Sequence, residues 1–201
     1  MRISKLSIYP IKSGPALACS SIKTTERGFE SDRRFMVVDD DGKFRSQRRT
    51  PVLGTVSLTL GAEGGLRVEA PGLEPLDVSQ PTEGPTPTTI WSDDVTSFYA
   101  GDDAATWFTK LVGDSSRLVW MPETSRRLFK EVEGVALSYA DSLPYLLTTE
   151  ASLEDLNSRI PGAPVPMAAF RPGLVVEGAN SPWAEDNWKV ILVHMDVGRF
   201  Q

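Results

Sequence analysis

Cysteine and histidine are nearly absent from this 201-residue sequence, and their scarcity excludes several kinds of site. Cys19 is the only cysteine and His194 the only histidine. One thiol cannot form a disulfide within the chain, and one Cys with one His cannot build the usual four-ligand zinc site. A Ser-His-Asp triad would have to use His194, and no Gly-x-Ser-x-Gly turn accompanies it. We therefore assign His194 no role.

Excess positive charge and long apolar runs are also missing. Lys and Arg number 21 against 27 Asp and Glu, so the net charge is −6 and the pI about 4.9. That balance disfavours nucleic acid and anionic membranes as partners, although it allows a local basic pocket for a small anion. No apolar run approaches the roughly 18 residues of a membrane helix, and the start lacks the apolar core of a signal peptide. We therefore expect a cytoplasmic protein that contacts no membrane.

The first hundred residues predict β-structure. Short apolar or alternating runs are separated by turns rich in Gly, Asp and Ser, which is the pattern of a barrel or sandwich. Asp39 to Gly42 predicts a hairpin turn, and the Pro-, Gly- and Glu-rich stretch 71–87 predicts a long loop or an edge excursion within the β unit. The expected strands cover residues 3–8, 35–38, 55–60, 66–69, 88–91 and 96–99.

From about residue 101 the pattern changes to mixed α and β. Asp102 and Asp103 are expected to cap a helix that Gly113 ends, and a second helix is expected to run from about Thr149 to Pro161. The stretch 122–134, with mixed charge, predicts a loop. Further strands are expected at residues 117–121, 144–147, 174–176 and 190–193, of which 144–147 is expected to be buried.

Seven short motifs follow one another along the chain in a specific order. They are YPIKS at 9–13, DRRFMVV at 32–38, SQRRTP at 46–51, YADSLP at 139–144, ASLEDLN at 151–157, FRP at 170–172 and PWAEDNW at 182–188. Together they resemble the MOSC-domain family with an N-terminal MOSC β-barrel domain, which includes the amidoxime-reducing proteins. The resemblance implies an α+β, mainly β fold. A β-barrel domain at 1–100 would precede a linker helix and the first part of a mixed α/β MOSC β-barrel domain at 101–201.

The resemblance also implies an activity and its partners. The family binds a molybdenum cofactor, a molybdopterin, between the two domains and reduces N-hydroxylated compounds such as amidoximes. Its electrons come from a redox partner protein of the ferredoxin, flavodoxin or cytochrome b5-like type. Pyridoxal phosphate binding is a further property associated with the family. The family's metal ligand is a cysteine beyond the Trp-Ala-Glu-Asp motif, and the sequence given ends at Gln201 before that position.

Seven polar residues are implied as cofactor contacts by the same resemblance. A molybdopterin carries a phosphate, which Arg binds through a bidentate fork and Lys as a point charge. Pro172 is expected to keep the residue before it extended, and alternation with Phe35 turns Arg34 away from the packed face. Each position also has a plain interpretation as a solvated loop or turn residue. The matching residues are Lys12, Ser13, Arg34, Arg48, Asp141, Ser142 and Arg171.

Two other functions stay open. The missing cysteine, with Ala169 and Gly173 where the family often has polar residues, fits a cofactor-free binding or scaffold module. A carrier similar to the cofactor sulfurases would have to use Cys19, the only thiol. Glu185 and Asp186 are weaker candidates for acid–base groups. Strands after residue 170 normally pair with later ones, so we also expect an unpaired edge that favours a homodimer.

Overall fold

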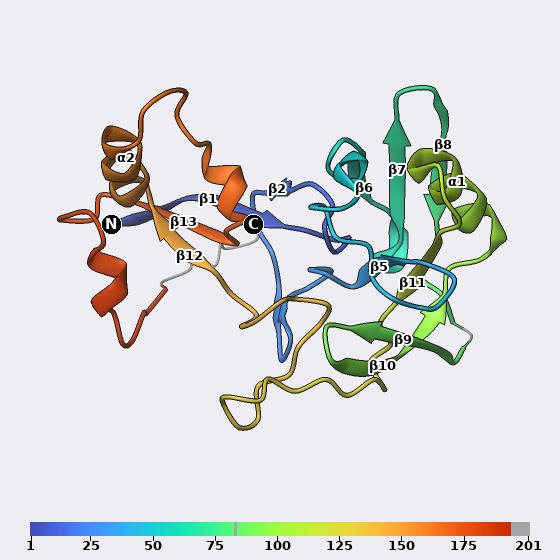
Figure 1. Cartoon of the computed structure of the whole chain (residues 1–201). Helices are drawn as coiled ribbons and strands as arrows, with labels where there is room; N and C mark the ends of the chain where they lie inside the picture. The colour runs from blue at the N-terminus through green and yellow to red at the C-terminus, as the bar shows by residue number, and fades with distance from the viewer. Residues whose placement is uncertain (83, 194–201) are drawn as a thin grey trace, which may run out of the picture.

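The computed structural model describes residues 1–82 and 84–193 and is mainly β (Figure 1). Its strands form a sheet ordered β12-β13-β1-β2, a sheet ordered β5-β11-β10-β9, a three-stranded sheet β6-β7-β8 and a short hairpin β3-β4. Two α-helices occur in the described part of the chain. The predicted α+β, mainly β fold class is confirmed. No described helix has the length and apolar character needed to cross a membrane.

The sheets β5-β11-β10-β9 and β6-β7-β8, with helix α1, make up what we call the barrel region. Every strand pair inside it is antiparallel. Its strands are β5 (Phe35–Val38), β6 (Ser57–Leu60), β7 (Leu66–Ala70), β8 (Leu73–Val78), β9 (Thr86–Ile90), β10 (Asp93–Tyr99) and β11 (Arg117–Trp120). Helix α1 is Asp102–Val112, and the 3-10 turns η1 and η2 are Pro51–Gly54 and Ala62–Gly64.

Strand β5 is buried on both faces, and this organises the core of the barrel region. Phe35 and Val37 pack into a cluster with Phe108 of α1 and residues of β6, β7 and β11. Met36 and Val38 point the other way and join a second cluster. Because successive side chains of a strand alternate between faces, a run of four apolar residues serves two cores at once.

The sheet β12-β13-β1-β2 joins the two ends of the described chain, and we call it the terminal sheet. Figure 1 shows β1, in blue, lying beside the orange β13. The two strands pair antiparallel, with Arg2 opposite Glu177 and Leu6 opposite Leu174. Helix α2 connects β12 to its parallel neighbour β13, as a parallel pair requires. The bounds are β1 (Arg2–Ile8), β2 (Leu17–Cys19), β12 (Leu147–Thr149), α2 (Glu150–Arg159) and β13 (Leu174–Glu177).

The remaining short elements lie between these sheets. They are β3 (Thr24–Thr25), β4 (Gly28–Phe29), η3 (Met167–Phe170) and η4 (Ala184–Asn187). The division of the chain at residue 100 stays a prediction. The sheets themselves cross that position, because β1 pairs with β13, and β5 and β10 both pair with β11.

Of the two interpretations of residues 71–87, the long loop is wrong and the edge excursion within the β unit agrees with the structure, because β8 and the start of β9 lie within this stretch. Leu73, Leu76 and Val78 pack toward the core of the barrel region. The proline-rich composition is what suggested a loop. Pro75 is tolerated because β8 is an edge strand, where one N–H is not needed by a neighbour.

Three expectations for the second half also need correction. The strand expected at 144–147 begins only at Leu147, and Tyr145 and Leu146 are 39% and 44% exposed. Residues 190–193 form no strand with the described residues and are exposed. Helix α1 begins at Asp102 with Gly101 as its N-cap, so Asp102 and Asp103 lie in the first turn and do not cap the helix. There their negative charges interact favourably with the positive end of the helix dipole.

The unpaired edge expected after residue 170 does not fall on β13. That strand is paired on both sides, with β12 and with β1. The edges of the terminal sheet are β12 and β2. Self-association through a sheet edge therefore stays a prediction, but the edge involved would not be β13.

Candidate functional site

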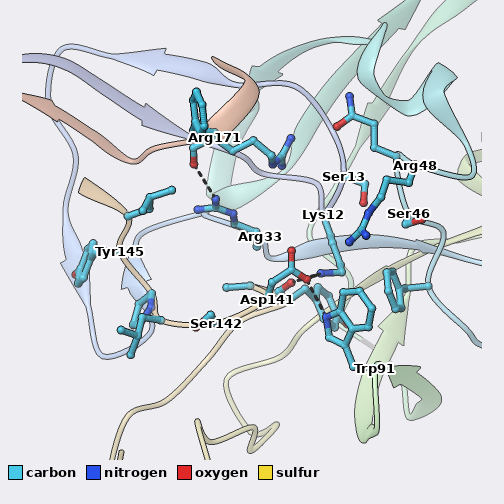
Figure 2. Close-up of a pocket in the computed structure, with 18 of the residues that line it drawn as sticks. Lys12, Ser13, Arg33, Ser46, Arg48, Trp91, Asp141, Ser142, Tyr145 and Arg171 are labelled. Atoms are coloured by element: carbon cyan, nitrogen blue, oxygen red, sulfur yellow. Dashed lines mark hydrogen bonds and ion pairs between the residues drawn. The ribbon is translucent and has the colours of Figure 1, made fainter. Parts of the chain in front are cut away.

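A cavity of about 530 Å³ is lined by segments from both halves of the chain (Figure 2). Residues 12–13, 44, 46–48, 139–146 and 169–171 line it, together with Arg33 and Trp91. Four of the lining side chains are cationic, Lys12, Arg33, Arg48 and Arg171, and one is a carboxylate, Asp141. A protein of net charge −6 thus concentrates positive charge in one hollow, which favours an anionic ligand there.

Six of the seven residues predicted as cofactor contacts line this cavity. They are Lys12, Ser13, Arg48, Asp141, Ser142 and Arg171. Lys12 and Arg171, at the extremes, are far apart in the sequence, and the pairing of β1 with β13 brings their segments together. Their proximity is a finding, whereas contact with a cofactor stays a prediction.

Arg34 is not among the residues that line the cavity, and the prediction that it faces the cleft is wrong. Its guanidinium donates a hydrogen bond to Glu123 Oε1 at 2.6 Å and another to the Met121 carbonyl. It also lies 5.0 Å from the centre of the Trp120 ring. Alternation misled us because β5 begins only at Phe35 and Arg33 has φ 48°, so the strand pattern does not extend back to position 34.

Arg33 lines the cavity instead, and sequence reasoning missed it. Its neighbour Asp32 is only 2% exposed and accepts hydrogen bonds from the Arg33 guanidinium and, at 2.7 Å, from the Tyr9 N–H. Burial raises the pKa of Asp32, while the adjacent Arg33 charge acts against that rise. The sequence signal for Arg33 was the carboxylate beside it, since a buried Asp needs a cationic partner.

Two like-charged guanidiniums lie against the ring of Tyr9. The guanidinium carbon of Arg171 lies 4.2 Å from the Tyr9 ring centre and that of Arg33 lies 4.5 Å from it. Arg33 donates to the Arg171 carbonyl at 3.4 Å, and Arg171 donates to the Gly14 carbonyl. Burial and the charge of Arg33 both lower the pKa of Arg171. An anion between the two groups would relieve this crowding of positive charge.

The backbone of Arg171 is left-handed, not extended as Pro172 led us to expect. Its φ is 57° and its ψ 45°, and it ends the 3-10 turn η3 with its N–H donating to the Ala168 carbonyl at 3.2 Å. Proline disfavours the right-handed helical conformation of the residue before it. Arg171 avoids that conformation by adopting the left-handed one and not the extended one.

Lys12 is held inside the wall of the cavity. Its side chain is 5% exposed, and its ammonium donates to the Tyr139 carbonyl at 3.0 Å and to Asp141 Oδ1 at 2.6 Å. The Phe44 ring centre lies 4.9 Å away. Burial lowers the pKa of Lys12, and Asp141 opposes the change. Since an ammonium has three donors, one stays available for a ligand.

The other predicted contacts are less constrained. Arg48 and Ser142 are exposed and Ser13 is half-buried. Within the described part of the chain, the side chains of Arg48, Ser142 and Ser13 make no hydrogen bond or ion pair. Arg48 therefore offers a complete guanidinium fork to a ligand in the cavity.

Backbone strain is concentrated at this cavity. Seven non-glycine residues of the described chain have positive φ, and four of them, Ser13, Arg33, Trp91 and Arg171, line it. L-residues rarely adopt this conformation, and it recurs where a site must aim particular side chains. The strain supports a functional role for the cavity independently of its charge.

Cys19 does not line the cavity. It lies in β2, half-buried, and burial raises the pKa of its thiol. Glu185 has a structural role, because it accepts hydrogen bonds from the Thr149 N–H and hydroxyl. No group of three or more His, Cys, Asp or Glu side chains within the described residues is arranged to hold a metal ion. His194 lies outside the described residues.

Comparisons with known proteins agree with the sequence motifs. Residues 1–115 match the model of the MOSC N-terminal beta barrel domain, and residues 135–199 match that of the MOSC domain. Among curated proteins, the chain is 34% identical over 209 residues to mitochondrial amidoxime reducing component 2 of Rattus norvegicus and 31% identical over 207 residues to that of Homo sapiens. Each match covers 95% of this chain and 60% of the relative, so the chain spans about 60% of their length.

A solved structure shows a weaker similarity. The solution structure of a Bordetella bronchiseptica protein matches 52% of this chain and 90% of its own, with a TM-score of 0.40 and 21% identity. That likeness is too low to support a shared fold. The two domain matches decide the question: the chain belongs to the family of proteins that carry a MOSC N-terminal beta barrel domain followed by a MOSC domain.

Proposed function

We propose that this chain binds the phosphate of a molybdopterin in the cationic cavity, as part of an enzyme that reduces N-hydroxylated compounds. The observation that carries the proposal is the convergence of Lys12, Arg33, Arg48 and Arg171 on one cavity of a net-acidic protein. The names of the amidoxime-reducing relatives support the reaction class. The volume of about 530 Å³ lies within the range of small-molecule sites.

The residues of the cavity fit the anionic part of such a cofactor. The guanidinium carbons of Arg33 and Arg171 lie 4.5 and 4.2 Å from the centre of the Tyr9 ring. Arg48 has no hydrogen-bond or ion-pair partner among the described residues. Fixed guanidiniums bind a phosphate with little loss of side-chain entropy, because Tyr9, Gly14 and Asp32 already restrict them.

The metal end of the cofactor finds no thiolate among the described residues of the cavity. Cys19 is the only cysteine in the sequence and lies in β2. We therefore limit the role of these residues to binding and orienting the phosphate and pterin. When bound, the molybdenum would supply the change of oxidation state that the reduction needs. Neither the cavity nor the relatives' names support binding of pyridoxal phosphate by this chain.

The proposal carries partners with it. A reductase of this kind takes electrons from a redox protein of the ferredoxin, flavodoxin or cytochrome b5-like type and acts on a small N-hydroxylated substrate. We include a cytoplasmic location in the proposal. These statements concern the whole enzyme. This chain spans about 60% of the length of its amidoxime-reducing relatives.

Titration calorimetry with inorganic pyrophosphate tests the anion site directly. We expect Arg33→Ala and Arg171→Ala each to weaken binding about tenfold or more, since a hydrogen bond to a charged group contributes roughly 1.5–3 kcal/mol. Arg34→Ala is the matched control: the same residue type one position away, outside the cavity, should leave the affinity unchanged. Equal losses for Arg33→Ala and Arg34→Ala would mean that the cavity does not bind the anion.

The cofactor itself is tested by expression in a host that makes molybdopterin. The purified protein is analysed for molybdenum and for the released pterin, which the proposal expects to find. Arg171→Ala should retain less pterin than Arg34→Ala. A protein that binds pyrophosphate but never carries a pterin would favour the cofactor-free scaffold instead.

A further inference from the structure

Trp91 occupies a position that its local backbone does not favour. It is the first residue of the two-residue loop between β9 and β10, in which Ile90 pairs with Asp93. Its φ is 55°, a conformation for which hairpin loops prefer Gly, Asn or Asp. The side chain is also 51% exposed, so it adds little to the core. Turn formation and packing therefore do not explain a tryptophan here.

The indole ring is nevertheless fixed in orientation. Its Nε1 donates a hydrogen bond to Asp141 Oδ1 at 2.8 Å, and its ring meets Phe44 edge to face with centroids 4.8 Å apart. The same Asp141 oxygen accepts from Lys12 at 2.6 Å. Because the N–H is used by Asp141, what the indole can offer a ligand is its face.

The hairpin that carries Trp91 is tied to the segment that carries Asp141. Asp93, at the start of β10, pairs with Arg127 at 3.0 Å and with Lys130 at 2.6 Å. Arg127 donates in turn to the carbonyls of Ser138 and Ala140. These contacts hold the loop of Trp91 and the chain before Asp141 at a constant spacing, so the ring is preorganised.

Trp91 lies on one side of the cavity, with the Lys12 ammonium 5.8 Å from its ring centre, and two arginines lie on another side. Figure 2 shows Trp91 across Lys12 and Asp141 from Arg33 and Arg171. Building on the proposed phosphate site, we infer that Trp91 is a stacking platform for the planar conjugated ring of the same ligand whose phosphate lies at the arginines. The ligand class is a phosphorylated planar heterocycle. Stacking on an exposed aromatic face is tolerant of ring identity, so nucleotides serve as probes of the class.

Calorimetry with GMP and ribose 5-phosphate tests the inference, because the two share a phosphate and sugar and differ by the ring. For the native chain we expect GMP to bind tighter, on the order of tenfold. Trp91→Leu should remove that advantage while leaving the affinity for ribose 5-phosphate unchanged. Trp91→Phe should keep most of it. Trp91→Asn, whose residue type suits positive φ, removes the ring without disturbing the loop, and should behave as Trp91→Leu does.

Trp183 provides a matched control elsewhere in the chain. It also has positive φ, 62°, is 39% exposed, and donates its Nε1 to a carboxylate, Asp155 Oδ2, at 2.7 Å. It does not line the cavity. Trp183→Leu should therefore leave both affinities as they are in the native chain.

The outcomes separate this inference from the proposed function. Equal affinity for GMP and ribose 5-phosphate in the native chain would overturn the stacking platform and leave the anion site standing. If neither probe binds, the anion site itself fails, and the platform with it. If neutral benzamidoxime binds in a manner that depends on Trp91 while GMP has no advantage, the ring contacts a separate substrate, and the inference about a phosphorylated ligand is wrong.

Discussion

The barrel region and the surroundings of the terminal sheet differ in how completely their apolar side chains are buried. In the barrel region, two apolar clusters exclude water almost completely, and Phe108, Met36 and Leu118 are fully buried. Beside the terminal sheet, Leu146 and Phe170 are 44% and 42% exposed. Apolar burial is the main favourable term in folding, so the barrel region holds the larger share of the stability.

Side-chain hydrogen bonds connect the elements around the terminal sheet. Thr149, fully buried, accepts from the Ser152 N–H at the start of α2 and donates to Glu185. Ser4 of β1 donates to Glu150 at 2.7 Å. The barrel region and the terminal sheet each have a neighbouring arginine that lines the cavity. Arg33 precedes β5 of the barrel region, whereas Arg171 lies just before β13.

Truncating one phenylalanine in each region gives the largest contrast. We expect Phe108→Ala to lower the free energy of unfolding by about 3–5 kcal/mol, because it leaves a cavity among packed side chains. Phe170→Ala should change it by no more than about 0.5 kcal/mol, since that ring is half in solvent. Urea denaturation of both variants measures the difference. Similar losses would show that the terminal sheet is packed as tightly as the barrel region.

The polar contacts of the terminal sheet are tested at Thr149. Thr149→Ala removes the helix cap of α2 and the hydroxyl bond to Glu185, and we expect a loss of about 1–2 kcal/mol in the free energy of unfolding. Thr149→Ser keeps the hydroxyl and should recover most of that loss. The same denaturation experiment measures both. A serine variant as unstable as the alanine variant would assign the effect to the methyl group and its packing.

Local sequence patterns were enough for the parts of the fold that depend on local chemistry. The four apolar residues of β5 and the helix ending at Gly113 in a left-handed cap follow from periodicity and capping. The partnership of β1 with β13 does not, because it joins positions about 170 apart and no local pattern encodes it. For β8 the sequence left a loop and an edge excursion open, because a proline in a strand is acceptable only where that strand lies at an edge.

The candidate site was predicted in part, and mostly by resemblance. The motifs placed Lys12, Asp141 and Arg171 in one cavity, which the residues alone could not have done. The choice between Arg33 and Arg34 depended on the φ angle of a single residue, which the sequence pattern does not report. Trp91 was treated as the end of a strand, because its left-handed backbone is equally invisible from alternation.

A smaller effect than that of Thr149→Ala is expected at Asp141, at the junction of the two regions. Burial against the wall alone would raise its pKa, but the charge and hydrogen bond of Lys12, with the bond from Trp91, lower it below 3.8. A lowered carboxyl pKa stabilises the fold above the unfolded value and loses that effect as the pH falls. The Asp141 side chain is 68% exposed, so Asp141→Asn should cost at most about 1 kcal/mol near neutral pH.

The pH dependence distinguishes an ion pair from simple packing at this position. The difference in unfolding free energy between the native chain and Asp141→Asn should be full at about pH 6 and shrink as the pH falls below about 4, because the carboxyl of the unfolded chain then takes up its proton before that of the native chain does. Urea denaturation across that interval measures it, with Asp186→Asn, an exposed carboxylate outside the cavity, as the control. A difference that stays constant with pH would mean that Asp141 contributes through its shape, and that Lys12 is held by Tyr139 and the aromatic rings without it.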